Sequence, residues 1–561
     1  MEQIQLVIDD LIKKGIVSKQ QFESAREESK NKGLPINKVL ISKGIVKEKD
    51  IASVISERLG IPFMDLSDYL IDADVIKLVP ESIAQRYKLI PLFKIGQTLT
   101  VAMADPQDIN AMDQVRLKSG CEIDAVLATE TDIKNAMDQY YGTSGGVEEV
   151  IKQMNEVKRS APVAPASDKE LAKMAEDAPV VKLVNMIIIQ AVTEKASDIH
   201  IEPDEKVLRV RYRVDGILHE VPKPPKDLEA AIISRVKVLA SMDIAERRKP
   251  QDGRIMMKMQ GKDIDMRVSC FPTVYGENIV IRLLDKTSLL LGLSELGMRP
   301  EMHKTFDKII RKPFGIMLVT GPTGSGKTTT LYAALNTINS EEKNIITIED
   351  PVEYQISMIR QTQVNPKAEL TFASGLRSIL RQDPDVIMVG EIRDSETAEI
   401  ATQAALTGHL VFSTLHTNDA SGAITRLADM GIEPFLISDA VIGVLAQRLV
   451  RVICPKCKEK LVPTDATLKD LKLKRSDDLA LYHGKGCAKC KDTGYVGRVG
   501  IYELLIIDDE LRKLIIAKAP ADQIKAKAVE LGMKTLYEDG IAKALEGITS
   551  VEEVLRVASE E

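Results

Sequence analysis

The chain has 561 residues and a net charge of −7; 44% of its residues are hydrophobic and 28% are charged. This length suggests three or four domains, and the composition is that of a protein with large cores rather than a disordered one. The acidic balance argues against a protein whose whole surface binds nucleic acid, because such surfaces are usually basic.

No membrane or export segment is visible. MEQIQLVIDDLIKKG lacks the apolar core of a signal peptide. A membrane helix needs about 18 uncharged apolar residues, and the nearest candidate, residues 434–450, is interrupted by Asp439 and Arg448. We therefore expect a cytoplasmic or peripheral protein.

The N-terminal region contains a repeat. LIKKGIV at residues 11–17 recurs as LISKGIV at 40–46, each followed by an amphipathic stretch, which predicts two helix–turn–helix units ending their first helices at glycine. Together with an α+β stretch they form an N-terminal regulatory or docking domain, residues 1–141. Residues 142–177, rich in Gly, Ser, Ala and Pro, predict a flexible linker.

Residues 178–290 predict a second domain of α+β type. Apolar and basic residues alternate over 207–214, as in a half-buried strand, and Asp215-Gly216 marks a hairpin turn. Arginine is frequent in this region. These side chains either form a solvated face of the sheet, or some of them reach an anionic ligand. The arginines are Arg209, Arg211, Arg213, Arg235, Arg247, Arg248, Arg254, Arg267 and Arg282.

Residues 291–505 predict a parallel α/β domain, because fully apolar strands alternate with helices. One strand, residues 315–319, runs into G-x-x-x-x-G-K-T and then a helix, which is the context that a phosphate-binding loop needs. Backbone N–H groups and a lysine bind the phosphates, and a hydroxyl binds Mg²⁺. The residues that would bind ATP and Mg²⁺ are Gly321, Pro322, Thr323, Gly324, Ser325, Gly326, Lys327, Thr328 and Thr329.

Three further strand ends carry polar groups. Glu391 follows the apolar run 385–390 and is placed to hold Mg²⁺ together with Thr328. Glu349 ends another strand, where a carboxylate could activate the attacking water. A third strand lies between His409 and His416, whose imidazoles could sense the γ-phosphate. Each group alone could be a solvated cap or a structural residue, but three in one sheet favour function.

Four of the six cysteines form two C-x-x-C pairs: Cys454, Cys457, Cys487 and Cys490. This pattern predicts a structural Zn²⁺ site in an insertion spanning 454–490. Cys121 and Cys270 stand alone and are interpreted as buried small apolar residues. Residues 506–561 predict a C-terminal helical segment.

The motifs GPTGSGKT, ITIEDPVEY, DVIMVGEIRD and TGHLVFSTLHTNDA, with ASDIHIEP and AERRKPQDGRI upstream, resemble those of the secretion ATPases of type II secretion and type IV pilus systems. The match runs from about residue 180 to the end, and the N-terminal repeat also fits. The resemblance implies a multidomain α/β protein: a RecA-like P-loop ATPase core, a preceding PAS-like domain and a homo-hexameric ring.

The same resemblance implies roles for single residues. Glu349 would be the general base, Glu391 the Walker B carboxylate, and His409 and His416 the histidine box. Arg267 and Arg282 would contact the phosphates from the second domain, with ATP between the second and third domains.

By function, the resemblance implies a cytoplasmic motor, peripheral at the inner membrane, that hydrolyses ATP to power type IV pilus assembly through a membrane platform protein. A cytoplasmic-ring adaptor is a further candidate partner. The alternative is a type II secretion motor. A nucleic-acid or DNA-uptake motor is disfavoured because aromatic residues are only 4%, and we expect no direct nucleic-acid partner.

Some relatives bind cyclic di-GMP through the N-terminal repeat. The corresponding positions here, Leu6–Ile8 and Pro35–Asn37, lack the arginine and leading glycine of that pattern. We therefore predict weak or no binding of cyclic di-GMP.

Overall fold

The structure is a computed structural model, and it describes residues 10–32, 36–66, 69–71, 73–141, 178–221, 223–259, 262–285, 291–463 and 480–558. The chain forms two compact units, Met1–Lys286 and Thr287–Glu561. The linker predicted at 142–177, together with Leu6–Ile8 and Pro35, lies outside the described residues. Among the described helices none combines the length and apolarity that crossing a bilayer requires.

The helical repeat is confirmed. Its second helices are α2 (Lys19–Lys32) and α4 (Glu48–Leu59). The two turns have the same geometry. Gly15 and Gly44 have φ angles of 73° and 67°. The backbone N–H of the following isoleucine donates to the carbonyl oxygen of Leu11 in the first turn and of Leu40 in the second. Equivalent apolar residues of the two repeats share one core: Leu11, Val17, Leu40 and Val46.

A small α+β fold follows, as predicted. Its sheet has the order β2-β3-β4, antiparallel and then parallel. The strands are β2 (Leu89–Ile95), β3 (Thr98–Met103) and β4 (Glu122–Leu127), and the helices are α6 (Glu81–Tyr87), α7 (Ile109–Ser119) and α8 (Glu130–Tyr140). An unpredicted short strand, β1 (Tyr69–Leu70), leaves this fold and pairs in parallel with β8 of the next sheet.

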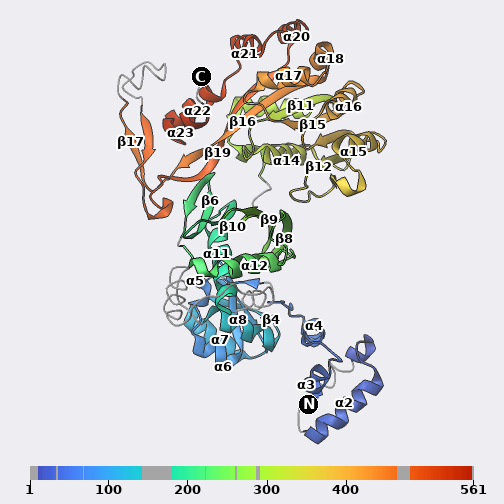
Figure 1. Ribbon diagram of the computed structural model, residues 1–561, viewed down its shortest axis with the longest axis vertical. Helices are drawn as coiled ribbons and strands as arrows, with labels where there is room; N and C mark the ends of the chain where they lie inside the picture. The colour runs from blue at the N-terminus through green and yellow to red at the C-terminus, as the bar shows by residue number, and fades with distance from the viewer. Residues whose placement is uncertain are drawn as a thin grey trace. The chain divides into compact units, whose positions relative to one another are not determined.

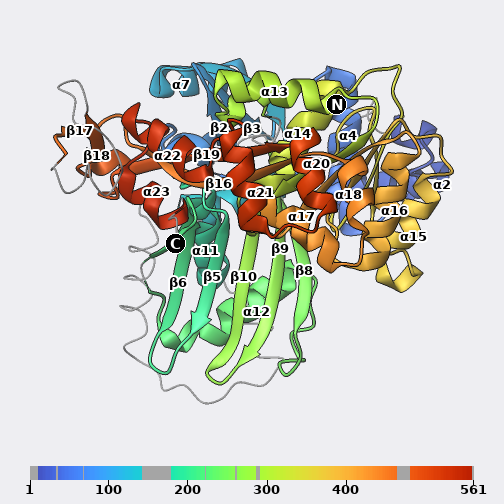
Figure 2. The same cartoon turned by 90° about the horizontal axis from the view of Figure 1, so that it is seen from above.

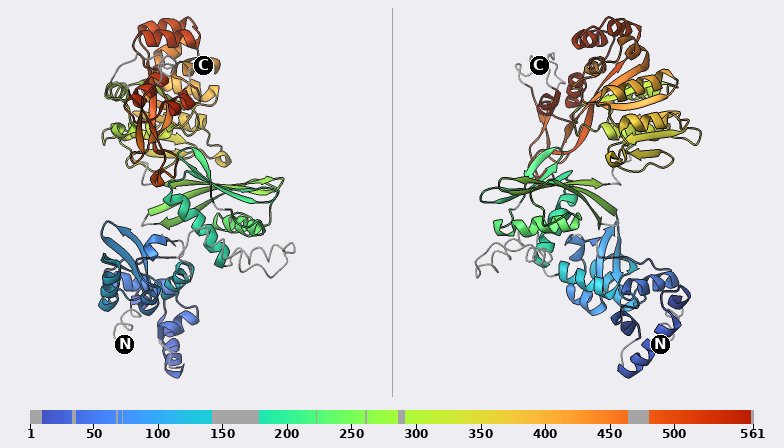
Figure 3. Two further views of the ribbon diagram at one scale, coloured as in Figure 1. Left: turned by 90° about the vertical axis from the view of Figure 1, so that its left-hand side faces the viewer. Right: turned by 45° about the vertical axis from the view of Figure 1, so that its right-hand side comes forward.

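The arginine-rich region is a seven-stranded sheet in the order β1-β8-β9-β10-β5-β6-β7, antiparallel apart from β1 (Figure 2). Helices α11 (Ala178–Thr193) and α12 (Glu229–Leu239) cover one face (Figure 3). Ile199, Ile201, Ile279 and Ile281 alternate toward that face and are fully buried. The strands are β5 (Asp198–Pro203), β6 (Leu208–Val214), β7 (Ile217–Glu220), β8 (Gln251–Met259), β9 (Lys262–Thr273) and β10 (Gly276–Asp285).

The second unit contains the predicted parallel sheet, in the order β13-β12-β14-β15-β11-β16-β19, with only β19 antiparallel (Figure 1). Alternate residues of β11 enter different cores, Ile316 and Leu318 one and Met317 and Val319 the other. Helices therefore cover both faces. The strands are β11 (Gly315–Thr320), β12 (Ile345–Glu349), β13 (Arg360–Gln363), β14 (Val386–Val389), β15 (Leu410–Leu415), β16 (Val441–Ile453) and β19 (Tyr495–Ile506).

One core holds α14 (Lys327–Ile338) and α13 (Pro300–Ile310), and the other holds α15 (Phe372–Ile379), α16 (Ser395–Leu406) and α17 (Ala420–Asp429). The apolar stretch 434–450 is divided between α18 (Pro434–Ala440) and β16, which lies between β11 and β19 in the sheet. Its apolarity thus serves a buried sheet rather than a membrane.

The C-terminal segment consists of short helices, as predicted: α20 (Asp509–Ile516), α21 (Ala521–Glu530), α22 (Leu536–Leu545) and α23 (Val551–Ala558). A hairpin of β17 (Lys458–Leu461) and β18 (Leu481–Gly484) belongs to the cysteine insertion. Leu481 of this hairpin packs against α22 and α23.

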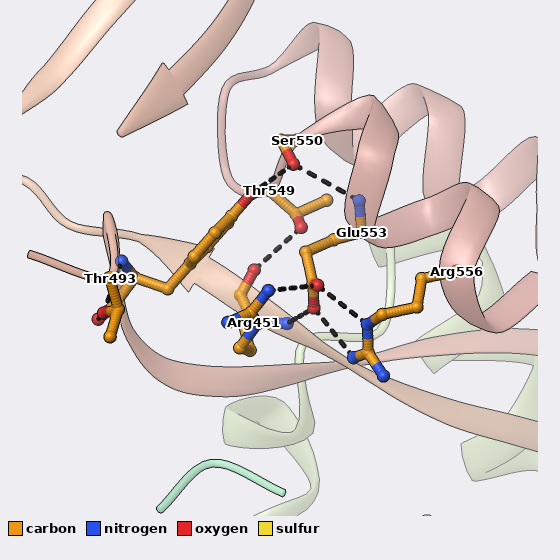
Figure 4. Close-up of polar contacts among 7 residues, drawn as sticks. Arg451, Thr493, Thr549, Ser550, Glu553 and Arg556 are labelled. Carbon is orange, nitrogen blue, oxygen red and sulfur yellow. Dashed lines mark hydrogen bonds and ion pairs between the residues drawn. The ribbon is translucent and has the colours of Figure 1, made fainter. Parts of the chain in front are cut away.

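A buried carboxylate fixes α23 to the long strand β16 (Figure 4). Glu553, 2% exposed, accepts from the Arg451 guanidinium at 2.6 Å and from the Arg451 N–H at 3.2 Å. Arg556 adds two bonds at 2.8 and 2.9 Å. These bonds outweigh the effect of burial and lower the pKa of Glu553 to about 2.

We expect Glu553→Gln to destabilise the second unit by about 3 kcal/mol, since it leaves a buried guanidinium without its charge partner. In a scanning calorimetry experiment this is a fall in melting temperature of about 5–10 °C. The stabilisation in the native protein is complete above the ordinary glutamate pKa and is lost as the pH falls toward 2. The matched control is exposed Glu552→Gln, and equal melting temperatures for both variants would contradict the assignment.

Candidate nucleotide and metal sites

The phosphate-binding loop lies where the sequence predicts it, between β11 and α14. Gly321, Gly324 and Gly326 have φ angles of 149°, 80° and 89°, a backbone region that other residues rarely adopt. A Cβ atom on Gly321 would lie 2.5 Å from the Gln447 carbonyl oxygen. The helix begins at Lys327, so its N-terminal N–H groups and its positive dipole end meet the loop.

Lys327 is folded back onto this loop. Its side-chain Nζ donates to the carbonyl oxygens of Gly321, at 2.8 Å, and Pro322, at 3.1 Å. Burial lowers the pKa of Lys327; nearby Glu391 raises it and nearby Arg448 lowers it further. An anionic phosphate would relieve both the burial penalty and the repulsion from Arg448.

Glu391 lies two residues beyond the last residue of β14, and two side chains contact its carboxylate. Arg393 contacts its Oε1 at 2.6 Å, and the His416 Nε2 lies 3.3 Å from its Oε2. His416 follows β15, the neighbour of both β14 and β11. The parallel register therefore brings Glu391 and His416 to the edge of the sheet that carries the phosphate-binding loop.

Glu349 ends β12 at the same edge, but it lies inside the protein. It is 3% exposed, and its carboxylate accepts hydrogen bonds from Tyr332, Thr347 and Gln361. Burial raises the pKa of Glu349 despite these bonds. Sequence reasoning found the carboxylate but not its surroundings.

His409 does not join this group. It precedes β15 at the opposite edge of the sheet, where its carbonyl oxygen accepts from Gly315 N–H and its Nδ1 lies 2.9 Å from the Ala404 carbonyl oxygen. His416 lies seven positions further along the extended strand. At about 3.3 Å per position, the two histidines are about 23 Å apart. Within one chain, only His416 can serve the site.

Several residues near the loop were missed by sequence reasoning. Gln447 of β16 is 1% exposed; its amide donates to the Ser325 carbonyl oxygen at 2.6 Å and accepts from the Thr330 hydroxyl at 2.8 Å. Arg448 donates to the carbonyl and side-chain oxygens of Asn418. These residues are more than a hundred positions from the loop and carry no local motif, so only the fold reveals them.

The two arginines predicted to contact phosphates are cross-strand partners in the first unit. Arg282 lies opposite Arg267, and the row continues to Arg254 on one side and to Asp198 on the other. Arg282 Nε donates to the Asp198 carboxylate at 3.1 Å and remains 58% exposed. The row lies on the face without helices, and its phosphate contact stays a prediction.

The four predicted cysteines converge. Their sulfur atoms lie within 4.8 Å of one another, with Cys454–Cys487, Cys457–Cys490 and Cys487–Cys490 distances of 3.9, 3.7 and 3.7 Å. A zinc tetrahedron with Zn–S bonds of about 2.3 Å has sulfur–sulfur edges of about 3.8 Å. The donor set therefore fits a closed, structural Zn²⁺ site. The lone cysteines Cys121 and Cys270 are buried, as predicted.

Comparison with known proteins decides the family. The model of the type II/IV secretion system protein family matches residues 173–556, and the MshEN domain model matches residues 59–147. The chain belongs to the type II/IV secretion ATPases. It is 45% identical to the type IV pilus assembly ATPase PilB of Myxococcus xanthus over 97% of both chains.

Other secretion ATPases are similar as well. The type II secretion system protein E of Xanthomonas campestris is 43% identical over 99% of this chain and 98% of its own. The solved structure of the Legionella pneumophila ATPase DotB superposes with a TM-score of 0.50 over 67% of this chain and 95% of its own, at 23% identity. This last likeness supports the RecA-like fold alone.

This secretion ATPase is thus an ATP hydrolase that uses ATP and Mg²⁺, as predicted. The loop from Gly321 to Thr328 has the backbone form that phosphate binding needs, and Thr328 and Glu391 carry oxygen atoms of the kind that Mg²⁺ prefers; their roles stay predictions. Bound Mg²⁺ would neutralise charge on the β- and γ-phosphates.

We expect the purified chain to contain one zinc ion, and Cys487→Ser to reduce the zinc content several-fold, since three thiolates no longer close the shell. Elemental analysis by mass spectrometry measures this. Cys121→Ser is the matched control and should keep its zinc. Full zinc content in Cys487→Ser would contradict the site.

We expect His416→Ala to raise the Mg²⁺ concentration for half-maximal ATP hydrolysis by about tenfold, because the imidazole orients the Glu391 carboxylate. His409→Ala should leave that concentration unchanged, because the His409 side chain contacts the Ala404 carbonyl oxygen at the opposite edge of the sheet. Magnesium titrations of steady-state ATP turnover test both variants, and equal shifts would show that the separation of the two histidines is irrelevant.

Proposed function

We propose that this secretion ATPase is a hexameric motor that powers type IV pilus assembly. One observation carries the proposal: a phosphate-binding loop and strand-end carboxylates share one sheet edge in a chain that aligns over 97% of its length with a pilus assembly ATPase. ATP hydrolysis would rotate the second domains, residues 178–290, against the ATPase domains, residues 291–505, around the ring. A membrane platform protein would use that motion to add pilin subunits.

In the proposed hydrolysis, Lys327 leaves its carbonyl partners and turns to the β- and γ-phosphates. Thr328 and Glu391 would hold Mg²⁺, and Glu349 would take the proton of the attacking water. Arg267 and Arg282 stabilise charge on the transferred phosphoryl group, which couples closure of the two units to hydrolysis.

A type II secretion motor is the second candidate. Its support is the 43% identity to the Xanthomonas protein over 99% of this chain, close to the value for the pilus ATPase. Both functions need the same hydrolytic site and differ in the platform protein and in the subunit that is moved. A nucleic-acid motor has weaker support, since the relatives with these names act in pilus assembly and secretion.

We further propose that the protein works at the cytoplasmic face of the inner membrane through its partners. The domain over residues 1–141 is a docking module for the platform protein or a ring adaptor. Weak or absent cyclic di-GMP binding stays a prediction.

We expect Glu349→Gln to lower the rate of ATP hydrolysis by about 10²–10⁴-fold, the usual contribution of a general base, with nearly unchanged ATP affinity. Steady-state turnover and nucleotide titration of the full chain measure this. The control is Glu342→Gln, an exposed acid before β12. Retained hydrolysis in Glu349→Gln would remove the carboxylate from its proposed role.

The function itself is tested by ATP turnover and mass determination, alone and with a platform protein of a pilus system in lipid vesicles. A hexamer whose turnover rises with that platform, and is lost in Glu349→Gln, supports the pilus motor. A response only to a type II secretion platform favours the second candidate. Stimulation by single-stranded DNA alone would overturn both.

A further inference from the structure

The carboxylate of Glu349 is enclosed by hydrogen-bond donors from three elements. The Thr347 hydroxyl of its own strand donates to Oε1 at 2.5 Å, and the Gln361 amide of β13 donates to the same oxygen at 3.1 Å. The Tyr332 hydroxyl of α14 donates to Oε2. A carboxylate has about four acceptor positions, so this arrangement leaves room for one more donor, such as a water molecule.

The donors are themselves held in place. The Tyr332 ring meets the Tyr354 ring edge-on, with centroids 4.5 Å apart. The amide of Gln361 also donates to the Tyr354 carbonyl oxygen at 3.0 Å and accepts from Ile356 N–H at 2.7 Å. The enclosure is therefore a connected network with one geometry rather than a set of adaptable surface contacts.

Tyr332 also links the carboxylate to the phosphate-binding loop. It lies on α14, the helix whose first residues are Lys327 and Thr328. A rigid helix that carries both the phosphate ligands and a donor to Glu349 sets the distance between the bound nucleotide and the carboxylate. Proximity of this kind is a major source of rate enhancement.

The electrostatic balance at Glu349 depends on these donors. Burial raises the pKa of the carboxyl, and the bonds from Thr347, Tyr332 and Gln361 lower it. The titratable groups that face it are Tyr332, Tyr354 and Glu353; Glu353 raises the Glu349 pKa further. Loss of one donor must therefore favour the protonated, non-basic form.

We infer that Tyr332 and Thr347 are positioning residues for ATP hydrolysis: their hydroxyl groups donate to the two oxygens of the Glu349 carboxylate and hold it in one orientation. The inference rests on the proposed role of Glu349 as general base. It assigns a function to two side chains that touch neither the phosphates nor the metal ligands by any contact described above.

The test uses the full chain with Tyr332→Phe and Thr347→Val, which each remove one hydroxyl and preserve the shape of the side chain. Tyr354→Phe is the matched control, because it removes a tyrosine hydroxyl from the same ring pair but keeps the ring that meets Tyr332 and the carbonyl oxygen that accepts from Gln361. The measurement is ATP turnover at saturating MgATP between pH 5.5 and 9, with KM at each pH.

In both variants we expect the acidic limb of the kcat profile to move to higher pH by about one unit, because a base with a raised pKa is protonated at a higher pH. At a fixed pH on that acidic limb kcat should fall about tenfold, and the KM for ATP should stay within about threefold. Tyr354→Phe should keep the parental profile. A structural role alone would lower stability without moving the acidic limb.

The two levels of the hypothesis fail separately. If Glu349→Gln hydrolyses ATP normally, the proposed base is wrong. If Glu349→Gln is inactive while Tyr332→Phe and Thr347→Val keep the parental profile, the base stands and the positioning inference is overturned. Should Tyr332→Phe fail to fold, Thr347→Val alone decides, since it acts on the other carboxylate oxygen.

Discussion

The hydrolytic site depends on the parallel register of four neighbouring strands. Because β12, β14, β15 and β11 run in the same direction, their carboxyl ends meet at one edge. Glu349 is the last residue of β12, and Glu391, His416 and the phosphate-binding loop begin within two residues of the ends of the other three strands. The same rule explains why His409, which precedes its strand, lies at the other edge despite its place in the same motif.

Around this edge the protein buries polar side chains that form hydrogen bonds to more than one element of the fold. Gln447 uses both ends of its amide to join β16 to the loop and to α14. Glu349 receives three donors from three elements. A buried polar group without a partner is costly, so such networks permit few alternative geometries. Rigidity of this kind suits a site that must hold a nucleotide, a metal ion and a base in register.

The far end of the second unit is held by different means. The described part of the cysteine insertion contains a short hairpin, and its four sulfur atoms are spaced for one zinc ion. Close by in the chain, Arg451 binds Glu553 and so attaches the last helix to β16. A metal tetrahedron and a buried ion pair thus replace the hydrophobic area that short helices and loops cannot supply.

The sequence by itself determined the local features: the phosphate-binding loop, the strand-end acids, the cysteine pairs and the helical repeat. Each of these depends on residues a few positions apart, whose spacing is visible in the chain. Only the folded chain shows the hydrogen-bond partners of Glu349, the bonds of Gln447 to the loop and to α14, the position of His409 and the pairing of β1 with β8. These are contacts between distant residues or consequences of strand order, and no local pattern encodes them, because packing and register are set by the whole sheet.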